Sequence, residues 1–215
     1  MPQDAAASPL ARLVQHISRV VHGKHEAITL SVVGLAAEGH VLLEDVPGTG
    51  KTTIAHLLAD SAGLRCRTFS AVLSGIKEVR TAMEEAERER RRSEKPTLMF
   101  VDEIHRFNKA QQDGFLPHME SGVVTLVGAT TETPCFELNA AILSRSQVLT
   151  LRALDLGALE RLLERAEAME EQKLPITAEA REALTEMADG DGRTLLNMAE
   201  QLFRVTDGPI GTKEM

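Results

Sequence analysis

The segment from Pro47 to Thr53 combines two glycines with a Lys-Thr pair in the order that phosphate binding requires. Gly48 and Gly50 permit backbone conformations, and a close approach to an anion, that a Cβ atom would prevent. Lys51 can reach the outer phosphates of a nucleotide, and the Thr52 hydroxyl can bind Mg²⁺. The strict pattern G-x-x-x-x-G-K-[ST] has Asp45 in place of its first glycine. The predicted nucleotide-binding loop consists of Pro47, Gly48, Thr49, Gly50, Lys51, Thr52 and Thr53.

Two carboxylates close an apolar stretch further along the chain. Residues 97–101 are followed directly by Asp102 and Glu103. Such an apolar run is typical of a strand inside a parallel sheet, whose carboxyl edge is where a phosphate-binding loop would lie. An Asp-Glu pair alone is most often a simple strand end, but the loop upstream favours a functional reading because both need the same sheet edge. We assign Asp102 to Mg²⁺ and Glu103 to the general base that activates an attacking water.

Polar groups that could act on the terminal phosphate follow the next apolar stretches. A hydroxyl of Thr130 or Thr131 could orient the lytic water, although a threonine-rich turn is the alternative. Arg145 lies in a polar turn between Ser144 and Ser146, and its planar guanidinium group suits a phosphoryl transition state. An arginine that acts on the nucleotide of a neighbouring subunit would make the active form an oligomer. A surface salt bridge is the alternative for Arg145.

Two further positions have weaker local signals. Arg193 lies at the start of a predicted helix, where a cation opposes the helix dipole. Either the adjacent aspartates or a nucleotide phosphate could compensate for it. Val21 and His22 lie in a segment of a kind found beside the adenine in many nucleotide-binding folds, and a turn between two helices is an equal alternative.

The elements that must position these groups follow from hydrophobic periodicity. Strands are expected at residues 41–43, 65–69, 97–103, 123–127 and 148–151. Helical patterns occupy residues 9–22, 25–38, 52–59, 75–92 and 138–143, with a helix and loop over 105–120. This alternation predicts an α/β core of three layers with a mainly parallel sheet, over residues 9–153.

Beyond residue 153 the pattern contains helices only. Asp155, Thr177 and Asp191 are expected to cap three helices, which would form a small helical lid domain over residues 154–206. Residues 1–8 are expected to be disordered, and residues 207–215 to form a flexible tail.

Composition narrows the function classes. The 215 residues are 43% hydrophobic and 26% charged, which allows one full core and a small second one. We expect no membrane segment and a cytoplasmic location, because no long uncharged apolar run or signal-peptide layout occurs. The net charge of −8 argues against a monomer that coats nucleic acid non-specifically. It leaves room for DNA bound locally, for example inside a ring of subunits.

Taken together, these motifs resemble those of AAA+ ATPases. Residues from about 70 to 205 closely resemble the replication-associated recombination protein A family, which is related to clamp loaders and to the Holliday-junction branch-migration motor. Residues from about 10 to 60 instead resemble MoxR-type AAA+ ATPases, chaperone-like proteins that usually have an acid-x-Pro-Gly form of the loop. The chain thus reads as a mosaic joined near residues 50–70. The segments that carry the first resemblance are 75–80, 100–113, 128–132, 143–145 and 188–193, and those that carry the second are 20–24 and 38–48.

The resemblance implies a P-loop NTPase core followed by the lid, with ATP and Mg²⁺ as cofactors. It implies that Lys51 and Thr52 form the first nucleotide-binding motif, and Asp102 and Glu103 the second. Three further roles follow from it: Thr131, with Thr130 beside it, as first sensor; Arg145 as a finger acting in trans in a homo-oligomer; and Arg193 as second sensor. The candidates for contact with DNA are Lys77, Arg80, Arg106 and Lys109.

The expected function is a Mg²⁺-dependent ATPase, converting ATP and water to ADP and phosphate, that remodels or loads onto single-stranded or forked DNA at stalled replication forks. One alternative is a MoxR-like chaperone that acts on protein substrates. Another is a nucleotide-binding module that lacks assembly and turnover, because the helical tetramerisation region expected after the lid does not follow in this sequence.

Overall fold

The computed structural model describes residues 8–45, 48–204 and 210–211. The chain divides into two compact units. Residues 1–45 and 51–151 form the first, called the core unit, and residues 46–50 and 152–215 form the second, called the helical unit. Among the described residues, no helix combines the length and apolar character that a membrane span requires.

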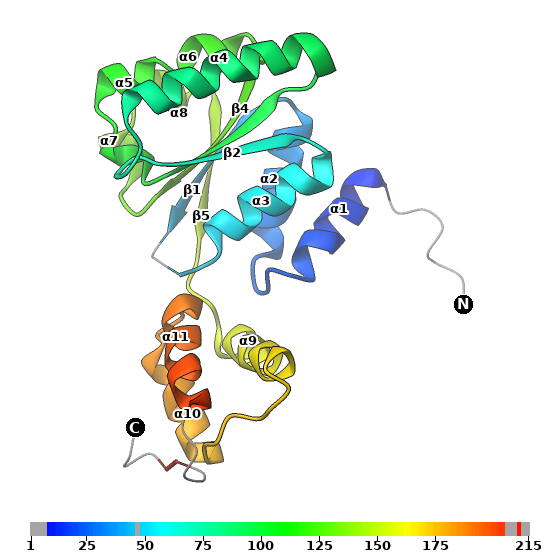
Figure 1. Ribbon diagram of the computed structural model, residues 1–215, viewed down its shortest axis with the longest axis vertical. Helices are drawn as coiled ribbons and strands as arrows, with labels where there is room; N and C mark the ends of the chain where they lie inside the picture. Colours follow the sequence, from blue (N-terminus) through cyan, green and yellow to red (C-terminus); the bar gives the residue numbers. More distant parts are fainter. Residues whose placement is uncertain (1–7, 46–47, 205–209, 212–215) are drawn as a thin grey trace. The chain divides into compact units, whose positions relative to one another are not determined.

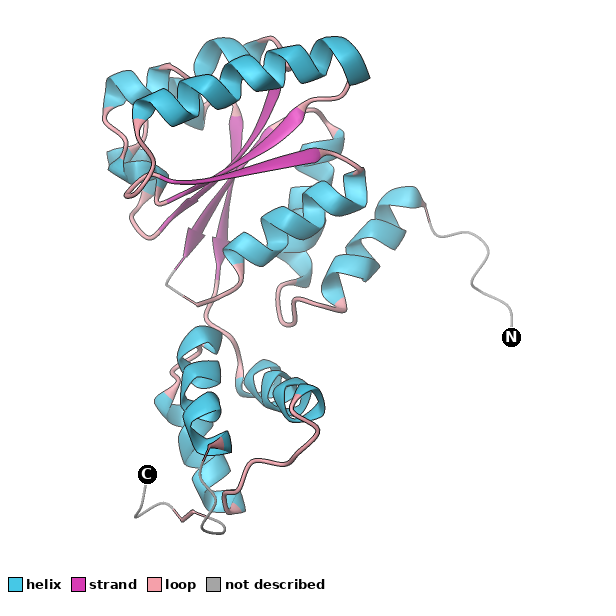
Figure 2. Ribbon diagram, in the orientation of Figure 1, coloured by secondary structure: helices cyan, strands magenta, loops and turns pink. Residues whose placement is uncertain are grey.

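In the described part of the core unit, five strands form one parallel sheet (Figure 2). The strand order across the sheet is β2-β3-β4-β1-β5. The predicted α/β fold with a parallel sheet is confirmed. The strands are β1 (His40–Asp45), β2 (Arg65–Ser70), β3 (Thr97–Asp102), β4 (Val124–Thr130) and β5 (Ser146–Leu151).

Helices cover both faces of this sheet, giving the three predicted layers (Figure 1). Alternate strand residues point to opposite faces. Val41 and Leu43 of β1 are buried with the helices of one face, whereas Leu42 is buried with those of the other. On the first face lie α1 (Pro9–Ser18), α2 (His25–Ala36) and α3 (Lys51–Ala62). On the second lie α4 (Ile76–Ser93), α6 (Leu116–Glu120) and α8 (Ala140–Leu143), with α5 (Lys109–Asp113) and α7 (Pro134–Glu137) in contact with α8.

Helix α4 illustrates why these segments are helical and how they attach to the sheet. Val79, Ala82, Met83 and Ala86 recur at helical spacing and are all buried on the second face. The rest of the helix is rich in charge and faces solvent, so its burial depends on this one apolar stripe. Its last turn carries Arg90, Arg91 and Arg92, whose positive charges interact favourably with the negative end of the helix dipole.

The helical unit contains the three predicted helices, α9 (Leu156–Met169), α10 (Ala178–Met187) and α11 (Gly192–Phe203). The predicted caps are confirmed. The Asp155 side chain accepts a hydrogen bond from the backbone N–H of Ala158 at 2.7 Å. Thr177 and Asp191 cap α10 and α11 in the same way. The unit has its own small core, which includes Leu159, Leu163, Leu184 and Leu195.

Three predicted boundaries differ from the observed ones. Ser8 is not disordered, because its side chain caps α1 by accepting a hydrogen bond from Ala11 N–H at 3.2 Å. The second helix ends at Ala36 rather than residue 38, where Glu38 takes a left-handed φ of 56°. Ile210, in the expected flexible tail, pairs with Ile176 in an isolated β-bridge.

Two other differences come from tertiary pairing and from length. Strand β4 continues to Thr130, although Gly128 and Thr130 favour turns, because both residues are paired with neighbouring strands. Helix α7 was not predicted, since a four-residue helix is too short to have a period. The polar segment after β3 contains the 3-10 helix Ile104–Arg106 and two short helices rather than the expected helix and loop.

Candidate active site at the carboxyl edge of the sheet

The predicted nucleotide-binding loop connects β1 to α3. Gly48 and Gly50 have φ values of +80° and +97°, a region that disfavours every residue with a Cβ atom. Lys51 is the first residue of α3, one position earlier than predicted, and is 9% exposed. The N–H groups at the start of this helix have no partner within the helix and are therefore suited to bind an anion.

The other loop residues differ in exposure. Thr49 is 2% exposed, whereas Thr52 and Thr53 lie exposed in the first turn of α3. Pro47 lies outside the described residues. Gly48 groups with the helical unit, where its carbonyl oxygen accepts a hydrogen bond from Gly192 N–H at 3.2 Å.

The register of the sheet brings the predicted carboxylates and threonines to the edge where the loop begins. Glu44 of β1 is paired with Thr130 of β4. Val101 of β3 is paired with Gly128 of β4, so Asp102 is level with the residue before Thr130. Because β4 lies between β1 and β3, and neighbouring strands are about 4.8 Å apart, the loop and Asp102 start from strands about 10 Å apart.

Glu103 sits in a constrained turn just beyond β3. Its φ is 54°, in the left-handed region that non-glycine residues rarely adopt, and it precedes the 3-10 helix directly. Its Oε2 accepts a hydrogen bond from the Thr131 hydroxyl at 3.1 Å. Its backbone N–H donates to Asp102 Oδ1 at 3.1 Å. The predicted base, metal ligand and first sensor are therefore neighbours in space.

His105 belongs to the same cluster, although no spacing pattern in the sequence indicated a role for it. Its Nδ1 lies 2.9 Å from Thr130 Oγ1, and its Nε2 lies 3.3 Å from Glu103 Oε2. The second contact is close enough for an electrostatic interaction, but its alignment falls short of a hydrogen bond. The signal in the sequence was its position two residues after Glu103. The spacing patterns known for histidine describe metal ligands and do not include contact with a carboxylate base.

The donor set at this edge fits Mg²⁺ bound through phosphates. Among the described residues, no group of three or more His, Cys, Asp or Glu side chains is placed to hold a metal ion by itself. Mg²⁺ is usually bound by one or two protein oxygens and completes its shell with water and substrate phosphates. A single carboxylate, Asp102, together with the exposed hydroxyl of Thr52, matches that requirement.

Arg145 lies away from this cluster. It directly precedes β5, whose first residue, Ser146, is paired with His40 at the start of β1. Arg145 is therefore at the amino edge of the sheet, and the six residues of β5 separate it from the carboxyl edge by about 20 Å. Its Nη2 lies 2.5 Å from Glu120 Oε1, so the predicted salt-bridge alternative is present in this chain. Burial, together with the charge of Arg145, lowers the pKa of His40.

The remaining predicted site residues have structural partners of their own. Val21 is 8% exposed and is buried in the same cluster as Ile17 and Ile28, in the turn between α1 and α2. His22, beside it, is partly exposed. Arg193 is exposed near the start of α11, where its backbone N–H donates to Asp191 Oδ1 at 2.8 Å. The negative charge of the adjacent Asp191 thus compensates for the positive end of the α11 dipole. Contacts of Val21, His22 and Arg193 with a nucleotide stay predictions.

Comparison with known families agrees with this architecture. The sequence profile of the ATPase family associated with various cellular activities (AAA) matches residues 41–153. That range includes the glycine loop, Asp102, Glu103 and both threonines. The chain belongs to the AAA family of ATPases.

Relatives of this AAA chain include two replication-associated recombination proteins A. The protein from Coxiella burnetii is 47% identical over 165 residues, covering 74% of this chain and 37% of the relative. The protein from Escherichia coli K12 is 45% identical over 174 residues, covering 76% of this chain and 38% of the relative. This AAA chain therefore spans less than two fifths of the length of these relatives. The predicted relationship to that family is confirmed.

Among solved structures, the Thermotoga maritima RuvB Holliday junction branch migration motor is similar to this AAA chain. Its TM-score is 0.66 at 26% sequence identity, and the alignment covers 85% of this chain and 62% of that one. The core and the order of its elements therefore follow a known AAA architecture.

Proposed function

We propose that this chain is a Mg²⁺-dependent ATPase module that acts on DNA. The observation that carries the proposal is the strand register, which brings the end of β1, where the glycine loop begins, to the same edge of the sheet as Asp102 and Glu103. Phosphoryl transfer to water requires a loop that binds the phosphates, a metal ligand and a general base.

Each residue has a distinct task in this proposal. Lys51 and the first N–H groups of α3 hold the β- and γ-phosphates, while Thr52 and Asp102 hold the metal. When bound, Mg²⁺ neutralises part of the phosphate charge. The water oxygen bonds to the γ-phosphorus as the bond between that phosphorus and the oxygen bridging to the β-phosphate breaks. The electron pair leaves with ADP, and Glu103 accepts a proton from the water.

Thr131 is suited to report the presence of the γ-phosphate. Its hydroxyl donates to Glu103 Oε2 at 3.1 Å. A γ-phosphate oxygen that accepted this hydrogen bond instead would free the carboxylate to face the water. Thr130, which is fully buried, would anchor the strand end rather than touch the nucleotide.

Assembly into a homo-oligomer would complete the site. Arg145 cannot reach the carboxyl edge of its own sheet, because the length of β5 lies between them. A head-to-tail contact that joined the amino edge of one core to the carboxyl edge of the next would bring it to a neighbouring nucleotide. Its pair with Glu120 would then have to open. Arg193 is proposed to contact the nucleotide from the helical unit.

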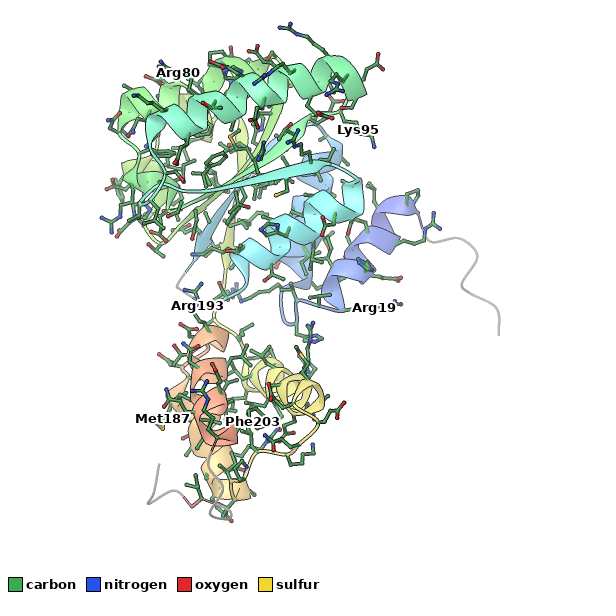
Figure 3. All side chains as sticks on the ribbon, viewed as in Figure 1. Arg19, Arg80, Lys95, Met187, Arg193 and Phe203 are labelled. Atoms are coloured by element: carbon green, nitrogen blue, oxygen red, sulfur yellow. The ribbon has the colours of Figure 1, made fainter. Side chains whose placement is uncertain are left out.

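A DNA-binding role rests on the relatives and on a basic surface of the core unit. The names of the relatives concern replication-associated recombination, and the similar solved structure is a Holliday junction branch migration motor. Lys77 and Arg80 are exposed on α4 (Figure 3 labels Arg80), and Arg106 and Lys109 are exposed just before and within α5. A hollow of about 390 Å³ lies between these helices, lined by Arg80 and Met83 on one side and Asn108 and Gln111 on the other. Of the four cations, Arg80 lines this hollow, and the other three lie within two residues of residues that line it. A basic surface of this kind suits a phosphate backbone.

The hydrolytic assignment is tested by nucleotide binding and phosphate release. Lys51→Ala should lose ATP binding, whereas Glu103→Gln should bind ATP normally and lose turnover. Equal turnover in Glu103→Gln and the parent chain would remove Glu103 as the base.

The DNA assignment is tested by adding single-stranded and forked DNA to the ATPase assay at low salt. The double substitution Lys77→Ala with Arg80→Ala should weaken DNA binding and flatten its salt dependence. Arg91→Ala with Arg92→Ala is the matched control, since it removes the same charge from the same helix about 20 Å away. Absence of DNA stimulation in the parent chain, or equal effects of the two doubles, would count against this surface.

The alternatives give different results in the same experiments. The resemblance of residues 10–60 to MoxR-type AAA+ ATPases stays a prediction, and a chaperone of that kind would be stimulated by unfolded protein rather than DNA. A module without assembly would remain monomeric with and without ATP, which a measurement of mass in solution detects.

A further inference from the structure

His105 is a buried titratable side chain to which the proposed chemistry gives no task. Its side chain is only 5% exposed. It follows the half-buried end of β3 by three residues. The left-handed turn at Glu103 and the 3-10 helix after it fold the chain back, so that the imidazole lies beside the carboxylate of Glu103.

The ring connects two residues of the candidate active site. Thr130 Oγ1 lies 2.9 Å from Nδ1, and Glu103 Oε2 lies 3.3 Å from Nε2. The same Oε2 also accepts the Thr131 hydroxyl at 3.1 Å. The end of β4 therefore contacts Glu103 twice, directly through Thr131 and indirectly through Thr130 and the imidazole.

Hydrogen-bond accounting decides which ring nitrogen of a neutral imidazole carries the proton. Thr130 Oγ1 accepts the backbone N–H of Glu132 at 3.0 Å and has one hydrogen to donate. If that hydrogen goes to Nδ1 of His105, the ring proton is on Nε2 and faces the negative Oε2 of Glu103. If it goes to the Glu132 carbonyl oxygen, 3.1 Å away, the ring proton must be on Nδ1 to donate to Thr130. The lone pair of Nε2 then faces the Glu103 carboxylate, which is repulsive. The first arrangement is the favourable one.

We propose that His105 is a positioning residue for Glu103, held in its tautomer by Thr130. Nε2 has no aligned hydrogen-bond partner among the described residues, so a small rotation of the Glu103 carboxylate completes the bond. Once Thr131 turns to a γ-phosphate, the imidazole remains as the partner that keeps Glu103 oriented toward the water. This inference rests on the proposed role of Glu103 as the base.

A positioning role affects turnover but not nucleotide affinity. His105→Ala should lower kcat by about tenfold to a hundredfold, as partners that orient a reactive ligand commonly do, with KM and the ATP dissociation constant within about twofold. His105→Gln can place an N–H near the former Nε2 and should recover part of kcat. His105→Asn is too short to reach Glu103 and should not. Thr130→Val removes the support of the tautomer and should also lower kcat.

The controls separate this role from a loss of structure. His56→Ala removes an exposed imidazole whose Nε2 lies 3.3 Å from Thr68 Oγ1, a similar pair away from the site, and should leave kcat unchanged. In a Glu103→Gln background, His105→Ala should cause no further loss of the residual turnover. Folding is followed by circular dichroism at 222 nm, and if His105→Ala does not fold, His105→Gln and Thr130→Val decide the question.

Three results would overturn the inference: kcat unchanged in His105→Ala, equal kcat in the Gln and Asn variants, or an undiminished effect of His105→Ala in the Glu103→Gln background. A parent chain with no ATP turnover would instead remove the proposed function, and this inference with it. A parent chain with normal turnover and no response at His105 would remove the inference alone.

Discussion

Glu167 provides a quantitative test of how the helical unit is held together. It is a buried carboxylate, 4% exposed, in the middle of α9. Its oxygens accept hydrogen bonds from Lys173 Nζ at 2.8 Å, Arg181 Nη1 at 2.7 Å and the backbone N–H of Leu174 at 3.1 Å. Burial alone would raise the pKa of this carboxyl. The three donors and the charge of Arg181 outweigh it and lower the pKa of Glu167 from 4.5 to about 2.

That shift sets the expected cost of removing the charge. A pKa lowered from 4.5 to about 2 corresponds to about 3 kcal/mol, by which the charged form is favoured in the folded unit. Glutamine resembles the neutral form of the side chain. We therefore expect Glu167→Gln to lower the free energy of unfolding by about 3 kcal/mol at neutral pH.

The pH dependence follows from the same direction of shift. Because the folded pKa is lower than the unfolded one, the stabilisation is complete above pH 4.5 and is lost as the pH falls from 4.5 toward 2. The Gln variant should lack this part of the acid dependence.

The assay is urea unfolding of the whole chain, followed by circular dichroism at 222 nm because the sequence has no Trp or Tyr. Glu160→Gln is the matched control. Glu160 also pairs with Arg181, at 2.6 Å, but its side chain is 42% exposed, and exposed pairs contribute about 1 kcal/mol or less. Equal effects of the two substitutions, or an acid dependence that persists in Glu167→Gln, would refute the reasoning.

Three further predictions test assembly, packing and capping. Mixing Arg145→Ala with Glu103→Gln subunits should restore some ATP hydrolysis that each lacks alone, if the arginine acts in trans; a fully active monomeric parent chain would contradict this. Gly128→Ala should lower the free energy of unfolding by about 1–3 kcal/mol in urea, because its Cβ would lie 2.6 Å from Leu42 Cδ2 in the middle of the sheet; an unchanged midpoint would show that the core accommodates the methyl group. Asp155→Ala should cost about 1 kcal/mol in the same assay through loss of the α9 cap, whereas Asp155→Asn should cost little.

Much of this architecture follows from local chemistry and was therefore predictable. The three caps of the helical unit are single side chains whose effect depends on residues two or three positions away. The apolar run that ends at Asp102 is a strand because it is buried on both faces, which composition alone indicates. The end of β4 was not predictable, since Gly128 pairs across the sheet with strands distant in sequence.

Residue types and spacing by themselves determined the glycine loop, the Asp102–Glu103 pair at a strand end and the parallel α/β core, because these depend on backbone freedom, periodicity and charge within short segments. Only the tertiary structure decided which groups are neighbours. It brought Thr131 and a buried His105 to the carboxylate of Glu103, and it placed Arg145 at the opposite edge of the sheet, paired with Glu120. The physical reason is that strand order and register join residues that are far apart in the chain, and no local pattern contains that information.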